Sequence, residues 1–526
     1  MRWGEPTSPH RLVLKMSSSR SSLHWILVTV LILSLGFVYF RSLAPGLTWA
    51  HHGADGGDFI SAAATGGVPH PSGYPTYLLL ARAFQFIPIG SLAFRMNLLS
   101  AVCAVAAAIL VYRSVARLPF FSGPLKWLGG FIAALAYGLS PLAWSQAVIA
   151  EVYSLQAFFL ALLLYLWSFR LETASRIPIR YDIVTGLACG LAMGNHLTTL
   201  FLLPLAFLMG GVVGRSNGNG LEVRGKNRLW SGWKIEWKSI GLRLAGFLVG
   251  LLVYLVLPLR AGSNPPINWG NPVTLKGFLW LVSGQLYAGR LFGVPLDFVV
   301  SRIQYWASLL IDQFGWVGLV VGLYGLFTIQ GASVKKLYYV TGWLFFAFSI
   351  FSIGYNSTDS DVYLIPAFMA YALWVGLGAA AFIQWLQRRK AWLGFLAGVL
   401  VLTALVIPAI IHYPAIDVSH DRTAEAYGTE LLDSTPADAI IFTEGDKATF
   451  TLWYFHFVLH QRPDVAVVVT GLLPYDWYRD TLSSTYPALS VPGVANGPWG
   501  ATMIQANPDR PACIATYQDT AEFSCQ

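Results

Sequence analysis

The chain has 526 residues, of which only 11% are charged and 55% are hydrophobic. Ordinary soluble domains carry about 25% charged residues, so this composition excludes a water-soluble globular enzyme. It also excludes a disordered chain and a small disulfide-rich fold. A polytopic membrane protein remains. The net charge of +8 is typical of one, because Lys and Arg gather on the cytoplasmic side, and it does not indicate a nucleic-acid partner.

Eleven apolar runs, most of about 18 to 22 residues, predict eleven transmembrane helices. In chain order they are His24–Phe40, Arg95–Tyr112, Trp127–Ser145, Val152–Phe169, Ile183–Gly194, His196–Val213, Ile240–Leu259, Tyr305–Ile329, Leu337–Gly354, Val362–Trp385 and Trp392–His412. The first follows a basic start and is expected to be an uncleaved anchor. The fifth and sixth are short and share one apolar run. Tyr74–Pro88 is also short and carries Arg82, which predicts a helix lying at the membrane interface.

Most of the 34 Lys and Arg residues fall in loops on one side of this arrangement, which predicts a cytoplasmic N-terminus. Treating Tyr74–Pro88 as a full span would place most basic clusters outside. The polar loop Arg215–Lys238 is expected to be a flexible cytoplasmic link. We therefore predict an all-α membrane domain over residues 1–412, with its first outer loop at 41–94, and a C-terminus outside the cell.

Residues 413–526 contain 14 of the 26 acidic residues and no spanning segment. Ala439–Thr443 and Val465–Thr470 predict buried strands, separated by an amphipathic helix near Lys447–His460 that Asp446 would cap. This pattern predicts a small extracytoplasmic α/β domain. Cys513 and Cys525 fall in it, where a disulfide is permitted, and the sequence leaves open whether one forms.

Acidic residues are scarce before residue 413, and carboxylates near a bilayer are costly and tend to be functional. Asp55 and Asp58 lie three residues apart in the first outer loop, and the intervening Gly56 and Gly57 would let the backbone approach a ligand closely. Titratable side chains also occur in this loop at His51, His52 and His70. A simple turn and helix cap is the alternative, but the scarcity of acids favours a catalytic base at the membrane surface.

Other outer positions are weaker candidates. Glu151 begins an apolar run, and function and a simple helix-start role are equally expected there. His196 is more typical of a packed residue, and Asp359 and Asp361 of a solvated turn. Five outer arginines are candidates for binding a lipid phosphate, and we expect one or two of them to touch the ligand: Arg82, Arg95, Arg260, Arg290 and Arg302.

Several known site patterns are absent from the sequence. There is no P-loop, dinucleotide fingerprint, Cys/His zinc spacing or hydrolase elbow. The cytoplasmic loops are also too short for a nucleotide-sugar domain. A lipid-linked donor reached from within the bilayer therefore fits better.

Five segments carry a family resemblance. The first runs from Asp55-Gly-Gly-Asp-Phe-Ile-Ser-Ala-Ala to Gly67-Val-Pro-His-Pro-Ser-Gly-Tyr-Pro-Thr-Tyr. The others are Arg95-Met-Asn-Leu-Leu-Ser, Trp144-Ser-Gln-Ala-Val-Ile-Ala-Glu-Val-Tyr, Gly194-Asn-His-Leu-Thr and Asn268-Trp-Gly-Asn-Pro. Over roughly residues 45–275 the chain resembles a bacterial family of multi-pass proteins that includes an animal protein O-mannosyltransferase. That family looks related to the GT-C superfamily of polyprenyl-phosphate-sugar glycosyltransferases.

The resemblance implies roles for particular residues. A carboxylate in the first outer loop would be the catalytic base, and we favour Asp55 for this role. Asp58 stands where the family commonly has Glu, and it would orient the acceptor or a divalent metal, which is possible here. Further residues in the matching segments are implied to bind substrate or donor: His70, Tyr74, Arg95, Asn97, Glu151, Tyr153, Asn195 and His196.

The function implied is transfer of a sugar, for which mannose is a candidate, from a polyprenyl phosphate to a hydroxyl acceptor such as a protein Ser or Thr. The reaction would occur at the outer face of the plasma membrane, in bacteria the inner membrane, with membrane lipid and an exported protein or glycan as partners. One alternative is a GT-C transferase that modifies a lipid or envelope glycan. A transporter or flippase for lipid-linked sugars is a second, disfavoured because the chain shows no inverted repeat.

Overall fold

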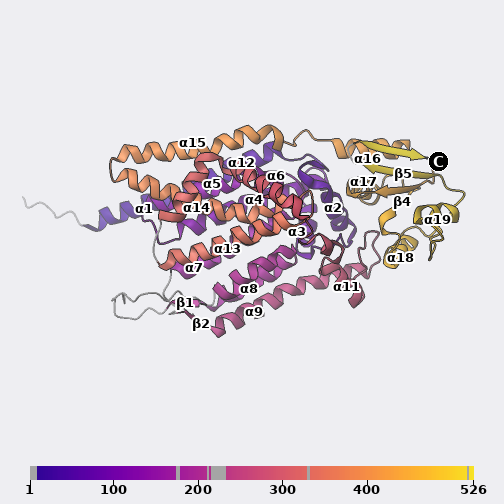
Figure 1. Ribbon diagram of the computed structural model, residues 1–526, viewed down its shortest axis with the longest axis horizontal. Helices are drawn as coiled ribbons and strands as arrows, with labels where there is room; N and C mark the ends of the chain where they lie inside the picture. The colour runs from indigo at the N-terminus through magenta and orange to yellow at the C-terminus, as the bar shows by residue number, and fades with distance from the viewer. Residues whose placement is uncertain are drawn as a thin grey trace, which may run out of the picture.

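Figure 1 shows a bundle of long helices with a small mixed α/β unit at the end that carries the C-terminus. This computed structural model describes residues 9–172, 178–209, 212–214, 233–328, 332–517 and 520–525. The predicted polar loop Arg215–Lys238 lies mostly outside the described residues.

Seven helical segments of the described chain are long and apolar enough to cross a membrane. They are Ser22–Ser42 of α1 (Pro9–Ser42), α4 (Leu92–Ala116), the run of α9 (Trp237–Leu251), η4 (Leu252–Leu255) and α10 (Val256–Ala261), α12 (Leu296–Thr328), Lys336–Gly354 of α13 (Ala332–Gly354), η6 (Ser360–Leu364) with α14 (Ile365–Gln387), and α15 (Ala391–Ile416). An eighth is the pair α5 (Pro124–Gly138) and α6 (Pro141–Ala147), bent by 68° at its break.

All eleven predicted spans contain helical residues, but three of these helical segments are shorter than a bilayer requires. They are α7 (Tyr153–Glu172), whose apolar part ends at Phe169, α8 (Ile179–Met193), and the run of η2 (Leu197–Leu202) and η3 (Pro204–Met209). The predicted interfacial helix is α3 (Pro75–Gln85), which at 11 residues is too short to cross. It lies with η1 (Ala50–Asp55) and α2 (Gly56–Thr65) in the predicted first outer loop, and α11 (Leu275–Val282) and η5 (Gln285–Arg290) lie in a later loop that was predicted on the same side.

Burial distinguishes the centre of the bundle from its rim. The most apolar window of the η6–α14 span is 94% buried, whereas that of α1 is 22% buried. Close helix crossings depend on small residues, because apolar side chains gain little by leaving lipid. A Cβ on Gly186 of α8 would collide with the Arg243 carbonyl oxygen of α9. The same two helices are joined by a buried ion pair between Arg243 and Asp182 at 2.8 Å.

The C-terminal unit is built on one four-stranded sheet in the order β4-β3-β5-β6. Its strands are β3 (Ile440–Glu444), β4 (Ala466–Val469), β5 (Ala512–Tyr517) and β6 (Ala521–Cys525), and its helical segments are α16 (Thr423–Ser434), α17 (Asp446–Trp453), η7 (Tyr454–Val458), η8 (Thr470–Leu472), α18 (Asp476–Thr485) and α19 (Trp499–Ala506). β3 runs parallel to β4 and β5, and β6 is antiparallel to β5. The two predicted strands and the helix between them are confirmed. The β5–β6 hairpin was not predicted, because its strands are half-exposed and lack an apolar run. A further short hairpin joins β1 (Val212–Gly214) and β2 (Trp233–Ile235).

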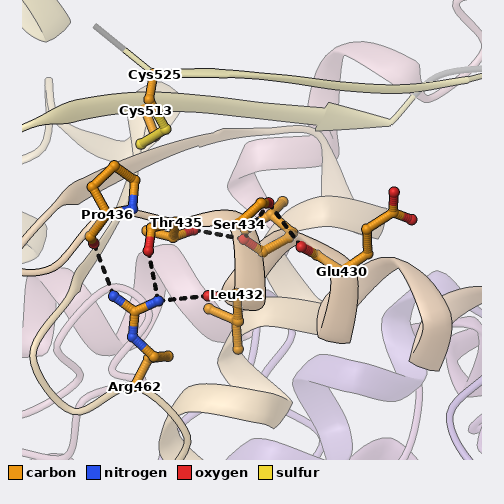
Figure 2. The surroundings of a disulfide bond; sticks show 9 residues. Glu430, Leu432, Ser434, Thr435, Pro436, Arg462, Cys513 and Cys525 are labelled. Atoms are coloured by element: carbon orange, nitrogen blue, oxygen red, sulfur yellow. Dashed lines mark hydrogen bonds between the residues drawn. A yellow bond between two sulfur atoms is a disulfide. The ribbon is translucent and has the colours of Figure 1, made fainter.

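A disulfide bond joins Cys513 of β5 to Cys525 of β6, which answers the question that the sequence left open (Figure 2). Nearby, Arg462 donates hydrogen bonds to the carbonyl oxygens of Leu432 and Thr435 at 2.6 and 2.7 Å. These bonds tie the end of α16 to the turn before β4. The predicted cap of α17 is wrong by one residue: Gly445 occupies the cap position, with a φ of 80° that suits glycine, and Asp446 is the first helical residue.

Candidate active site

A cavity of about 1200 Å³ lies where the outer loops of the bundle meet α17. Side chains reach it from η1, the segment before α3, α7, η2, η5, α13, the loop before η6, η6 itself, and α17. Five of the ten predicted site residues line it, together with one of the five outer arginines: Asp55, His70, Tyr74, Tyr153, His196 and Arg290. Because these residues are far apart in the chain, only the fold brings them together.

The first outer loop takes unusual backbone conformations beside the cavity. His51, His52 and Tyr74 have φ values of 55°, 65° and 45°, in the left-handed region that side chains other than glycine rarely adopt. Each such residue costs on the order of 1–3 kcal/mol, and strain of this kind tends to gather at functional sites. Gly56 and Gly57 do not admit a ligand as predicted. A Cβ at these positions would instead lie 3.0 and 2.6 Å from protein carbonyl oxygens.

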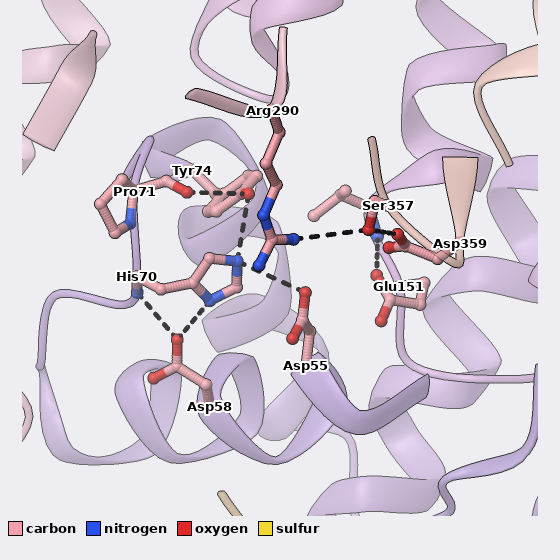
Figure 3. A network of polar contacts seen from close by, with 10 residues as sticks. Asp55, Asp58, His70, Pro71, Tyr74, Glu151, Arg290, Ser357 and Asp359 are labelled. Atoms are coloured by element: carbon pink, nitrogen blue, oxygen red, sulfur yellow. Dashed lines mark hydrogen bonds and ion pairs between the residues drawn. The ribbon is translucent and has the colours of Figure 1, made fainter. Parts of the chain in front are cut away.

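His70 links the two predicted catalytic carboxylates (Figure 3). Its backbone N–H and Nδ1–H both donate to Oδ2 of Asp58, at 2.8 and 2.7 Å. On its other edge, Nε2 lies 3.1 Å from the Tyr74 hydroxyl and 3.5 Å from Oδ2 of Asp55. The Tyr74 hydroxyl has one hydrogen and donates it to the Pro71 carbonyl oxygen at 3.2 Å. His70 therefore donates from both ring nitrogens, as an imidazolium does.

The two carboxylates differ in access. Asp58 is completely buried behind the imidazole, whereas 36% of the Asp55 side chain is exposed. Burial among the cavity walls raises the pKa of Asp55 to about 7, against the opposing effect of His70. Burial alone would lower the pKa of His70, but Asp55 and then Asp58 raise it to about 9. Asp55 can therefore take up a proton near neutral pH while His70 stays charged.

Besides Lys447, the cationic residue Arg290 lines the cavity. Its Nη1 atom lies 3.4 Å from Oγ of Ser357, whose hydroxyl in turn donates to Asp359, and its guanidinium lies 5.2 Å from the ring centre of Tyr287. These contacts leave several of its five N–H donors for a phosphate. The other predicted arginines bond protein oxygens: Arg82, Arg95, Arg260 and Arg302.

Three of the predicted binding residues do not reach the cavity. Asn97 donates to the carbonyl oxygens of residues 44 and 46, at 2.8 and 2.9 Å. Arg95 clamps three carbonyl oxygens between α3 and α4, at residues 85, 89 and 90. Asn195 bonds the carbonyl oxygen of Val152 at 3.2 Å. Their contacts hold loops in place, and nothing in them supports ligand binding.

Glu151 is a different case. It is buried beside the site, with Oε2 accepting a hydrogen bond from Val152 N at 3.3 Å. Its Oε1 atom has no hydrogen-bond partner among the described residues. Burial raises its pKa well above the usual value, and the nearby Asp55 adds to this effect. Both effects favour the neutral form of the Glu151 carboxyl group.

Some cavity residues were missed in the sequence. Asp359 lies in a loop that reads as a solvated turn, and Asp446 precedes a helix and reads as a cap. Tyr287 and Ser357 carry no local pattern that sets them apart. No three His, Cys, Asp or Glu side chains in the described part of the chain come together as metal ligands do, so we derive no step through a metal.

The fold is that of the GT-C glycosyltransferases. The structure matches ArnT from Cupriavidus metallidurans bound to undecaprenyl phosphate, with a TM-score of 0.59 and 11% identity over 94% of this chain and 93% of that one. It also matches the Archaeoglobus fulgidus oligosaccharyltransferase, with a TM-score of 0.50 and 12% identity over 85% and 64% of the two chains. These likenesses confirm the predicted fold class.

Comparison of sequences shows which proteins the chain is similar to. Residues 55–213 match the family model "Protein O-mannosyl-transferase TMEM260 N-terminal domain", and residues 424–495 match "TMEM260-associated domain 2". The chain is 24% identical to the Dictyostelium discoideum protein O-mannosyl-transferase tmem260 and 29% identical to the Mus musculus one, over 90% and 84% of its length. It spans about three fifths of each relative, 60% and 62%. The resemblance to a family with an animal O-mannosyltransferase is thereby confirmed.

Proposed function

We propose that this protein is a membrane glycosyltransferase that moves a sugar from a polyprenyl-phosphate donor to a hydroxyl of an exported acceptor. Mannose and protein Ser or Thr are the candidates that the named relatives favour. The proposal places the cavity at the extracytoplasmic side of the plasma membrane. The observation that carries it is Asp55, an accessible carboxylate with a pKa of about 7 in a cavity that also holds Arg290.

The chemistry assigned to these residues is a single displacement. Asp55 accepts the proton of the acceptor hydroxyl while the hydroxyl oxygen forms a bond to the anomeric carbon of the sugar. The bond from that carbon to the phosphate oxygen breaks, and the lipid phosphate leaves with one more negative charge. Arg290 stabilises that charge, as does the nearby His70 imidazolium. One base and in-line attack lead to inversion at the anomeric carbon, since retention would need a nucleophilic carboxylate.

Asp58 acts through His70 and touches no substrate in this scheme. Its buried carboxylate fixes the ring orientation and keeps the imidazole charged, since two of its hydrogen bonds come from His70. Tyr74 and the ring of Tyr153 form part of the wall around the reacting groups. His196 lies within 6.2 Å of Tyr74 and 5.7 Å of Tyr153, measured between ring centres.

The test is transfer from synthetic polyprenyl-phosphate mannose to a Ser/Thr peptide by the purified protein. Wild type is expected to transfer, and Asp55→Asn to lose transfer while it still binds donor. Asp297→Asn is a matched control, because Asp297 is an exposed carboxylate of α12 that lies outside the cavity. Wild-type transfer to a lipid or glycan hydroxyl alone would support the alternative transferase. Movement of donor across vesicles without bond cleavage would support a flippase.

A further inference from the structure

Helix α17 of the C-terminal unit forms one wall of the cavity. It packs against α2 so closely that a Cβ on Gly57 would lie 2.6 Å from the carbonyl oxygen of Phe450. The ring of Phe450 stacks on the His70 imidazole, with centres 6.1 Å apart and planes at 16°. The indole N–H of Trp49 donates to Oγ1 of Thr451 at 3.0 Å. The C-terminal unit therefore touches the same loop that carries Asp55.

This packing places Asp446, the first residue of α17, on the cavity. Its carboxylate is exposed there and makes no hydrogen bond or ion pair with any residue in the described ranges. An exposed carboxylate ordinarily contacts only water, but the Asp446 carboxylate lies on the cavity that also holds Asp55 and His70. It lies near enough to Asp55 and His70 to influence the ionisation of both. Its two carboxylate oxygens remain available as acceptors for a ligand.

The residues that line the cavity differ from one side to the other, and the two sides suit different substrates. The cavity's leucine and phenylalanine side chains come from η2, the segment after η5, and α13: Leu197, Leu200, Phe201, Leu291, Phe292 and Phe351. Since α13 contains a candidate membrane span, this side suits the lipid donor. Asp446 comes from the C-terminal unit, and its negative charge would repel a phosphate. The neighbouring Lys447 also lines the cavity, but its ammonium group lies over the rings of Trp49 and Tyr517, 5.8 and 5.1 Å from their centres. Asp446 is therefore better suited to an uncharged polar group of the acceptor.

We infer that Asp446 is a specificity-determining residue that accepts a hydrogen bond from a polypeptide acceptor, so that the C-terminal unit supplies the acceptor half of the active site. This inference rests on the proposed function for its choice of acceptor. The acceptor that occupies this half of the site is an extended Ser/Thr-containing segment of an exported protein, with one of its hydroxyl groups at Asp55. The amide hydrogens of such a segment are donors that match the free carboxylate.

The test separates acceptor binding from catalysis. A fluorescent Ala-Thr repeat peptide is titrated onto full-length Asp55→Asn protein and onto the Asp55→Asn, Asp446→Asn double variant. We expect the double variant to bind about tenfold more weakly or worse, since it loses a hydrogen bond to a charged group. Asp480→Asn in the same background is the matched control, because Asp480 is an exposed acid of α18 outside the cavity.

A second measurement uses the active protein. At about pH 8, between the pKa values of Asp55 and His70, Asp446→Asn is expected to raise the KM for the peptide about tenfold. The KM for donor and the slow transfer to water should change less than about twofold there. Equal peptide binding by the two proteins, no peptide binding at all, or an equal loss of transfer to water would overturn the inference. A weaker-binding double variant alongside an inactive wild type would instead support the peptide site and count against the proposed function.

Discussion

The Nδ1 atom of His70 lies 2.7 Å from a carboxylate oxygen of the fully buried Asp58. The opposite nitrogen of the same ring lies 3.5 Å from the accessible Asp55. One imidazole thus separates a carboxylate that is held in the protein from one that can meet a substrate. This arrangement assigns different roles to two acids that are only three residues apart, and the predictions below depend on it.

The first prediction concerns pH. Asp55 must be ionised to accept a proton, so transfer should fall about tenfold for each pH unit below about 7. His70 must be protonated to stabilise the leaving phosphate, so the rate should also fall above about pH 9. A bell-shaped profile of kcat/KM for the purified protein is the expected result. A rate that does not fall as the pH is lowered from about 7 to about 5 would exclude Asp55 as the base.

Asp58→Asn should change the profile as well as the rate. Without the buried carboxylate the pKa of His70 falls, because one of the charges that raise it is lost. We expect kcat to fall by about tenfold or more and the alkaline limb of the profile to move to lower pH. The measurement is the same pH series. An unshifted alkaline limb with reduced activity would mean that Asp58 serves the fold alone.

Replacement of Arg290 should affect the donor. Arg290→Ala should raise the KM for donor roughly 10- to 100-fold, since it removes charge-assisted hydrogen bonds to phosphate. Arg290→Lys should recover part of this loss, because it keeps the charge but lacks the paired donors. Binding of labelled polyprenyl phosphate alone gives an independent readout. Arg290→Ala protein that binds this lipid as tightly as wild type would place the phosphate elsewhere.

Gly57→Ala tests whether α17 must dock on α2. The new methyl group would meet the Phe450 carbonyl oxygen, and overpacking of this kind costs about 1–3 kcal/mol. We expect faster proteolysis within the C-terminal unit and reduced transfer. Gly471→Ala is the control, because no atom of the described residues lies within 4 Å of a Cβ there. If both variants resist protease as wild type does, the close contact is not required.

The sequence predicted those features that a local pattern of residues, or the low number of acidic residues, indicates. Apolar runs located the long helices, and the lack of acids in the membrane part singled out Asp55 and Asp58. The short helix before Pro88 was also predicted, from the length of its apolar run. The sequence did not predict contacts between residues that lie far apart in the chain. Arg95 and Asn97 belong to a matching motif, yet their side chains bond loop carbonyls.

Asp446 is a cavity residue that the sequence alone did not identify. Its local sequence is that of a helix start, and only the docking of α17 against Gly57 reveals that it faces the cavity. Likewise, Arg290 was one of five equivalent outer arginines until the fold placed it beside Tyr287 and Ser357. Residues of this kind acquire a role from tertiary packing, which a single sequence does not contain.

The central claim is that Asp55 is the base of a sugar transfer from a lipid phosphate. The most direct measurement is single-turnover transfer from polyprenyl-phosphate mannose to a Thr peptide, comparing wild type with Asp55→Asn at saturating donor. The account predicts glycosylated peptide and free polyprenyl phosphate in equal amounts with wild type, and neither with Asp55→Asn protein that still binds donor. Glycosylated peptide formed by Asp55→Asn at the wild-type rate would contradict it.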